Sequence, residues 1–448
     1  MIFKTNIEDN KFIIRAITEN IQEASGFMLE GSFRPIKLVS DEVRLEFNYI
    51  PERTHPDILA LICYCAFYPY LTKSDGVTFP EPISVKAKSE FEKFFTFYAK
   101  NGQRMDADPI AVRNYSESQK PYKGEYSALI AFGGGMDSTS LSLLFPEYLV
   151  VNQVDIPDHR GVMHDYFKIL SNRNPEFSGI SEYTNIRGIS EPYGFSGWVC
   201  CFLLPLLVAT DKNMNSILSG AIFGSSYMSG SGKKFNTDSL KYNKPFKEVD
   251  KKWKHRSWLY LFKELGIFQY SPVAGLTEVL SSKLIYDNKL ATEVLYCQQN
   301  EGKPCHQCPK CFRKNLELEF WEYVHTGEIR TLDYWNGYNN KRTINRYRDD
   351  YQYFGHIMNF LSQSVPNYNK PNWFKDNALF CNANTSWVTK CYTKSLGRIP
   401  DEFLKVTKER LESNFEYMDQ VEIFLTESYN HERYAFSNFA KSKEALSG

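Results

Sequence analysis

Short apolar runs alternate with stretches of helical periodicity over the middle of this chain. The apolar runs at 126–132, 148–155, 183–189 and 216–224 predict strands. The segments 138–145, 164–171 and 196–212 predict the intervening helices. Strands that alternate with helices form parallel sheets covered on both faces, so we expect an α/β core in this region.

The flanking sequence follows other patterns. Residues 36–50 predict two strands with a turn between them, 56–71 and 89–100 predict helices, and 116–125 is a polar stretch typical of a linker. Beyond residue 330 the pattern is mainly helical, most clearly at 401–429. We therefore expect three regions: a mixed α/β extension at 1–122 that is a candidate for partner docking, an α/β domain at 123–325, and a mainly helical region at 326–448.

A glycine-rich loop joins the first predicted strand to the first predicted helix. Its sequence is Phe132-Gly133-Gly134-Gly135-Met136-Asp137-Ser138-Thr139-Ser140. The first N–H groups of a helix have no intrahelical partners and the helix dipole favours negative charge there, so such a loop can bind a phosphate. Glycine lets the backbone approach the anion closely. We expect the hydroxyls to add donors, and Asp137 to order the loop or bind Mg²⁺.

Known phosphate-binding motifs fit this loop poorly, and a glycine-rich turn with no ligand stays an alternative. The spacing G-x-x-x-x-G-K-[ST] is absent, and G-x-G-x-x-G lacks its third glycine. The later segment 230–235 also fails the first pattern, because Tyr227 stands where glycine is needed and Lys234 stands where Ser or Thr is needed.

A cluster of cysteines is the second candidate for chemistry. Cys297, Cys305, Cys308 and Cys311 have the spacing C-x7-C-x2-C-x2-C, which suits a tetrahedral structural Zn²⁺ site with no open position. An iron–sulfur cluster is the second interpretation, and redox-active or unliganded thiols are the third. The remaining cysteines fall mostly in apolar runs, where a thiol packs as a small hydrophobe.

Composition and charge narrow the class of protein. Hydrophobic residues make up 42% of the 448 residues and charged residues 24%, which indicates a folded globular chain of several domains. The formal net charge is zero, so a nucleic-acid partner is not expected, although 244–254 is locally basic. No signal peptide or membrane span is recognisable, which predicts a cytoplasmic protein without a membrane partner.

The glycine loop resembles the S-G-G-x-D-S signature of the PP-loop ATP pyrophosphatases, with Gly133 in place of the first Ser and with Gly134, Gly135, Asp137 and Ser138 matching. Together with the cysteine cluster, it resembles the 7-cyano-7-deazaguanine synthases (the QueC family) over 126–318. The resemblance implies a Rossmann-like parallel sheet that binds ATP and Mg²⁺ at residues 132–140. Asp137 and Ser138 would serve the reaction, and the four cysteines would hold Zn²⁺.

The resemblance also implies the reaction. We expect adenylation of a small-molecule carboxylate such as 7-carboxy-7-deazaguanine, followed by amide or nitrile formation with an amine, with release of AMP and pyrophosphate. The family's P-G-R-N element should fall near 193–198, where this chain has YGFSGW, and Arg313 lies near the position of a family arginine. The extra terminal regions resemble QueC-like proteins of bacterial anti-phage systems, which suggests a protein acceptor or defence partner. A homodimer is a further candidate.

Two other functions compete with this one. A tRNA thiolase or lysidine synthase would share the ATP loop. A thiolase would need a reactive cysteine, and the candidates Cys200 and Cys201 lie in an apolar segment expected to keep them protonated. A non-catalytic QueC-like module that binds a nucleotide or a partner is the second competitor, favoured by Gly133 and by the altered P-G-R-N element.

Overall fold

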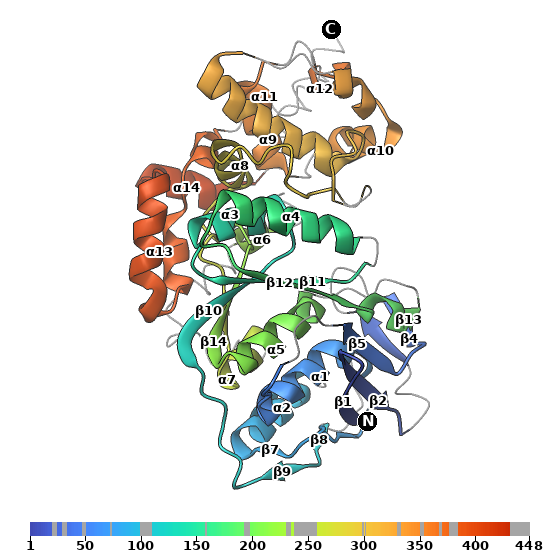
Figure 1. The fold of residues 1–448 in the computed structure, drawn as a ribbon. Coiled ribbons are helices and arrows are strands. Elements are labelled where there is room, and N and C mark those ends of the chain that lie inside the picture. Colours follow the sequence, from blue (N-terminus) through green and yellow to red (C-terminus); the bar gives the residue numbers. More distant parts are fainter. Residues whose placement is uncertain are drawn as a thin grey trace. The chain divides into compact units, whose positions relative to one another are not determined.

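The computed structural model divides the chain into two compact units (Figure 1). The first comprises Met1–Gly133, Pro146–Ser219 and Asp250–Tyr270, and the second comprises Gly134–Phe145, Gly220–Val249 and Ser271–Gly448. The boundaries predicted at residues 122 and 325 stay predictions. The residues that the structure describes are 1–19, 25–28, 34–46, 51–71, 74–98, 110–156, 159–191, 198–229, 234–236, 258–297, 300, 302–328, 333–349, 354–366, 370–375 and 384–430.

A mixed, mostly parallel sheet forms the centre of the first unit. Its strands, in spatial order, are β1 (Ile2–Glu8), β2 (Lys11–Ile17), β5 (Glu42–Glu46), β12 (Gly179–Thr184), β11 (Leu149–Val154), β10 (Glu125–Ala131), β14 (Met214–Ser219) and β17 (Phe268–Tyr270). The pairings from β12 to β17 are all parallel, while β1, β2 and β5 are added in antiparallel fashion. This confirms the predicted α/β class and the predicted parallel sheet.

The parallel strands are doubly wound. From β10 the chain moves outward through β11 to β12, and then returns to the other side of β10 with β14 and β17. Strand order therefore reverses between β10 and β14. In open α/β sheets, ligands bind beyond the carboxyl ends of the strands at such a switch point. The segment that follows β10 is the glycine loop.

Helices cover both faces of this sheet within the first unit (Figure 1). Helix α5 (Leu203–Asp211) packs on β10, β11 and β14, and α1 (Pro56–Leu71) packs against α5. Helix α4 (His159–Arg173) packs on β11 and β12 from the other side. Side chains of successive strand residues point to opposite faces, so Leu129, Val151 and Ile217 join the core that includes α1 and α5.

Shorter elements complete the first unit. They are α2 (Val85–Tyr98), α7 (Trp258–Glu264), β3 (Ser25–Met28), β4 (Arg34–Leu38), β6 (Gly76–Val77), β7 (Ile83–Ser84), β8 (Ala111–Val112), β9 (Tyr115–Ser116), β13 (Ser190–Glu191), and 3-10 turns at Ile186–Ile189 and Trp198–Phe202.

The second unit is largely helical. It contains α3 (Met136–Leu144), α6 (Phe223–Tyr227), α8 (Glu278–Asp287), α9 (Pro309–Thr326), α10 (Lys341–Ile344), α11 (Gly355–Ser364), α12 (Asn372–Lys375), α13 (Asp401–Asn414) and α14 (Gln420–Ser428). Strand β15 (Met228–Ser229) pairs antiparallel with β16 (Lys234–Phe235). There are also 3-10 helices at Asp333–Tyr338, Ser386–Thr389 and Thr393–Arg398, and a π-helix at Asn345–Asp349. Helix α8 contacts both α3 and α9. This confirms the predicted helical character of the C-terminal region.

Several predicted elements have different bounds. The strand predicted at 183–189 is wrong: β12 ends at Thr184, because the Asn185 side chain accepts a hydrogen bond from Arg44 N–H at 2.7 Å and donates one to the Glu42 carbonyl. The strand predicted at 216–224 ends at Ser219. The predicted 401–429 helix is two helices. The pairing of Tyr417 with Cys391 interrupts it, and Asp419 starts α14 with a capping box.

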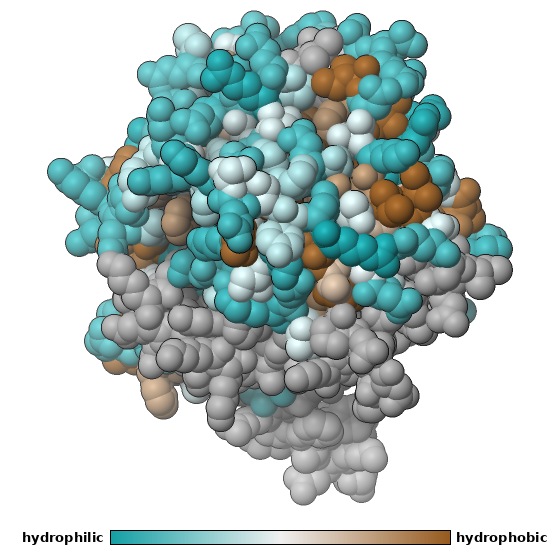
Figure 2. Space-filling view, turned by 90° about the horizontal axis from the view of Figure 1, so that it is seen from below, coloured by the Kyte–Doolittle hydropathy of each residue, from teal (hydrophilic) through white to brown (hydrophobic). Residues whose placement is uncertain are grey.

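On the face drawn in Figure 2 the coloured residues are mostly hydrophilic, and hydrophobic residues lie in separate small groups. The exposed large hydrophobic residues described in the first unit include Val39, Val85 and Tyr126. Single exposed apolar side chains of this kind are normal for globular proteins. Within the described ranges, no helix combines the length and the apolar character needed to cross a bilayer.

Candidate functional site

The glycine loop makes a turn that depends on one left-handed glycine. It runs from the end of β10 to α3, and Gly134 has a φ of 74°, a left-handed conformation that favours glycine. Gly135 is the N-cap of α3 in an extended conformation and brings no capping side chain. The first N–H groups of a helix generally lack intrahelical partners, and a helix start without a capping side chain is suited to binding an anion.

The loop's side chains divide into two groups. Thr139 and Ser140 are fully buried, and the Ser140 hydroxyl donates to the Ser281 carbonyl of α8 at 2.8 Å. The Phe132 ring packs against Tyr166 and Phe167 of α4. By contrast, Gly133 is exposed, and the Asp137 side chain keeps 36% of its surface accessible.

Ser138 lies between these two groups. It is largely buried, and its hydroxyl donates to the Gly135 carbonyl at 3.1 Å. Because the side chains of Phe132, Thr139 and Ser140 are buried, these three residues could contact a ligand through their backbone atoms. The groups that can face a phosphate are the loop amides, Asp137 and, after a rotation of its hydroxyl, Ser138.

Gly220, directly after β14 in the sequence, touches the start of α3. A Cβ at this position would lie 2.7 Å from Ser138 N and 2.8 Å from Ser138 Cα. Those are backbone atoms that cannot rotate away, so only glycine fits. The sequence pattern that points to Asp137 and Ser138 gives no hint of this contact, because 82 positions separate Gly220 from Ser138.

Two lysines of α9 bring positive charge to Asp137. Lys314 Nζ lies 3.4 Å from Asp137 Oδ1, which also accepts a hydrogen bond from the Ser281 hydroxyl at 3.0 Å. The Lys314 side chain is only 2% exposed. Burial lowers the pKa of Lys310, and the Asp137 carboxylate opposes that shift. The sequence analysis did not identify Lys314 as a site residue. The signal that could have pointed to it is the basic pair Arg313-Lys314, shortly after Cys311.

Behind Lys314, a cluster of charged side chains is buried in the second unit. Glu317 lies 3.0 Å from Lys314 Nζ and 3.2 Å from Arg313, and Arg313 also approaches Glu278 at 3.9 Å. His356 Nε2 lies 3.7 Å from the Glu278 carboxylate. Charges this deep in a protein persist only when they are paired, and here each carboxylate faces a cation.

The two glutamates of this cluster have opposite pKa shifts. Burial would raise the pKa of Glu278, but His356, Arg313 and Lys314 hold it below its usual value. Burial raises the pKa of Glu317, and Lys314 and Arg313 oppose this shift without cancelling it. The cluster therefore constrains Lys314 and Arg313, because losing either cation would leave the buried Glu317 with one positive partner in place of two.

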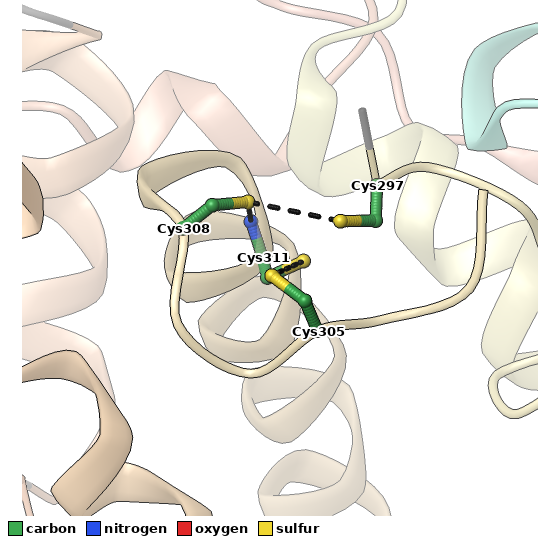
Figure 3. Close-up of side chains that lie close together, drawn as sticks. All are labelled: Cys297, Cys305, Cys308 and Cys311. Carbon is green, nitrogen blue, oxygen red and sulfur yellow. Dashed lines mark hydrogen bonds between the residues drawn. The ribbon is translucent and has the colours of Figure 1, made fainter. Parts of the chain in front are cut away.

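The four predicted metal-binding cysteines converge on one point (Figure 3). Their sulfur atoms all lie within 4.8 Å of one another, with 4.0 Å between Cys297 and Cys308 and 3.8 Å between Cys305 and Cys311. In a tetrahedral Zn²⁺ site the sulfurs lie about 2.3 Å from the metal, so they are about 3.8 Å apart. The cluster is compatible with zinc binding.

Local structure fixes these sulfurs. Gly302 has a φ of 89° and turns the chain so that Cys297 and Gly302 pair, and a Cβ there would strike Leu295. Cys308 is the N-cap of α9 and accepts a hydrogen bond from Cys311 N–H at 3.4 Å. Hydrogen bonds from the Cys311 thiol and amide lower the pKa of Cys308 to about 5. A thiolate is the form that binds metal.

The turns after α9 pack against the cysteine cluster. The Gln307 carbonyl accepts hydrogen bonds from Thr343 at 2.7 Å and from Asn340 at 2.8 Å, and Tyr347 donates to the Pro309 carbonyl. Next to Cys311, Phe312 contacts a set of aromatic rings made of Trp335, Tyr338, Tyr347, Trp373 and Phe374. The cluster is therefore built into the core of the second unit, as expected of a structural site.

The other cysteines differ from expectation at one position. Cys63, Cys65, Cys200 and Cys391 are buried as predicted, and burial raises the pKa of Cys63, Cys65 and Cys391. Cys201, however, is exposed, because it lies on a 3-10 turn before α5 and not inside a buried helix.

Some sequence features named above lie outside the described residues. They are Cys381, the basic stretch 244–254, residues 193–197 of the altered P-G-R-N element, and residues 230–233 of the second glycine segment.

Comparison with known proteins gives one match. Residues 257–430 match a family of unknown function (DUF6395). The matched segment includes the four cysteines, Lys314 and the buried charge cluster, but not the glycine loop. No curated protein and no solved structure matches the chain.

Proposed function

We propose that this protein is an ATP-dependent, AMP-forming ligase that activates a carboxylate and joins it to an amine. The observation that carries the proposal is the start of α3. There, a glycine loop that brings no capping side chain to the helix start lies beside a partly exposed carboxylate, Asp137, and a buried cation, Lys314. The likeness of the loop to the PP-loop signature supports the same interpretation, and so does the doubly wound strand order.

Each group has a task in this reaction. A carboxylate is a poor electrophile, and transfer of AMP to it creates a leaving group that an amine can displace. Loop amides and Lys314 would neutralise the departing pyrophosphate, since positioning and charge stabilisation dominate such chemistry. Asp137 Oδ1 is held by Ser281 and Lys314, which would leave Oδ2 to bind Mg²⁺.

Zinc would have a structural role in this scheme. Four thiolates leave no coordination position for substrate, so the metal would stabilise the turn that leads into α9. Cys308 caps helix α9, and Cys311 lies in its first turn. The same helix carries Lys314, so metal binding would be connected to the geometry beside Asp137.

The proposed substrate is 7-carboxy-7-deazaguanine or a similar carboxylate, with ammonia or an amine of a partner protein in bacterial antiviral defence as the acceptor. Purified protein is incubated with ATP, Mg²⁺ and this carboxylate, with and without ammonium, and the products are identified by mass spectrometry. AMP with a deazaguanine amide or nitrile is the expected result. AMP without an ammonium-dependent product would indicate a macromolecular acceptor. Bound ATP that is never cleaved would instead favour the non-catalytic module.

A tRNA-modifying enzyme is the second candidate, and the exposure of Cys201 favours it. A thiolase needs an accessible thiol, and Cys201 meets this requirement while Cys200 does not. Binding of tRNA with a steep salt dependence, and loss of tRNA thiolation in Cys201→Ser, would support this alternative over carboxylate activation.

A further inference from the structure

We propose that Glu317 is a positioning residue, which holds Lys314 where the phosphates of the nucleotide would bind. This inference rests on the proposed function. Lys314 lies between two carboxylates, with its Nζ atom 3.0 Å from Glu317 Oε2 and 3.4 Å from Asp137 Oδ1. The Glu317 side chain is fully buried, whereas Asp137 is partly exposed. The ammonium group is therefore anchored on its inner side and faces the loop on its outer side.

Glu317 is itself held in place. It lies one helical turn after Arg313 and Lys314 on α9, so all three side chains share one face of the helix. Arg313 approaches Glu317 Oε1 at 3.2 Å, and its guanidinium lies 3.8 Å above the centre of the Phe354 ring. One oxygen of Glu317 therefore faces Arg313 and the other faces Lys314, and both cations belong to the same helix.

This anchor has a consequence for Asp137. A lysine side chain is long and flexible, so its compact ammonium charge can move toward the nearby carboxylate that attracts it most. With Glu317 present, Lys314 is shared between two carboxylates. Without that charge, Lys314 would be drawn fully to Asp137 and would compete with Mg²⁺ for it. Glu317 thus keeps both Lys314 and Asp137 available to Mg²⁺-ATP, and a preformed arrangement of this kind needs no rearrangement on binding.

The same helix offers a matched control. Glu319 is also buried, and it pairs with the buried Lys370 at 2.6 Å. Lys370 lies over the Trp335 ring at 4.4 Å, away from Asp137. Glu317→Gln and Glu319→Gln each remove one buried negative charge that faces a lysine. The two variants should lose similar stability, but only one of them changes the surroundings of Lys314.

The test compares full-length wild type, Glu317→Gln and Glu319→Gln by AMP formation at varied ATP and Mg²⁺, together with thermal unfolding. Mutation of a residue that supports a metal ligand from behind commonly lowers metal affinity or activity by about 10–100-fold. We therefore expect Glu317→Gln to raise the KM for Mg²⁺-ATP at least about tenfold more than Glu319→Gln, at similar unfolding temperatures. Charge-retaining Glu317→Asp should recover part of the loss.

Three outcomes separate the claims. Equal KM values for the two Gln variants would overturn the positioning role while leaving the proposed function intact. A wild type that neither binds nor cleaves ATP would overturn both. If Glu317→Gln does not fold, the uncharged Glu317→Met is compared with Glu319→Met, and equal KM values for Mg²⁺-ATP in that pair would again overturn the role of Glu317.

Discussion

Gly220 offers a sharp test of the site, because the structure predicts that one added methyl group disrupts it. A Cβ at Gly220 would lie 2.7 Å from Ser138 N and 2.9 Å from Asp137 C, whereas ordinary contact begins at 3.4 Å. The start of α3 would have to move by the difference, 0.7 Å. Gly133→Ala is the matched control, since a Cβ there meets nothing within 4 Å.

The size of the effect follows from that displacement. Overpacking of this kind costs about 1–3 kcal/mol of stability, while a misplacement of about 1 Å at a reacting group can cost on the order of 100-fold in rate. We expect Gly220→Ala to stay folded, with kcat/KM for AMP formation reduced by more than about tenfold. Gly133→Ala should stay close to wild type, and Gly133→Ser would restore the serine of the PP-loop signature.

The assay measures AMP release, ATP affinity and the unfolding temperature for both glycine variants. Wild-type ATP affinity and turnover in Gly220→Ala would refute the argument that the start of α3 forms the phosphate site.

Three further predictions concern the loop, the metal and the buried charges. Asp137→Ala should abolish ATP turnover with little change in unfolding temperature, since the side chain is partly exposed; AMP formation at the wild-type rate would refute this role. Cys308→Ser should lower zinc content and stability together, because structural zinc contributes on the order of 10 kcal/mol to folding. The exposed Cys201→Ser is its control, and a well-folded, metal-free Cys308→Ser would contradict a structural metal. Because the pKa of Glu278 is held below its usual 4.5, this residue stabilises the fold above that pH, and the contribution is lost as the pH falls through its lowered pKa. Acid unfolding should therefore be less steep in Glu278→Gln, and unchanged steepness would argue against the shift.

The sequence predicted best where a signal is local. The helix at 56–71 has the predicted bounds, because Pro56 at its first position suits a helix start and apolar residues fill the following turns. The four cysteines were found from short spacings that one turn and one helix start can satisfy. The loop between β10 and α3 was found in the same way, since three glycines follow an apolar strand.

Prediction failed where distant segments decide the structure. The antiparallel strands β1, β2 and β5 extend the same sheet as β12, although they lie in the region predicted as an N-terminal extension. The capping box at Asp419 was visible in the sequence and was missed, so α13 and α14 were taken as one helix.

By itself, the sequence determined the α/β class, the glycine loop and the cysteine cluster, because each depends on residues close together in the chain. Only the tertiary structure decided that Lys314 meets Asp137 across 177 positions, that Gly220 abuts Ser138, and that Glu317 anchors Lys314 from within. These contacts come from the packing of α3, α8 and α9, and no local pattern encodes which buried charge will face another. The physical reason is that a charge can be buried only beside its counterpart, and the fold alone determines which counterpart is near.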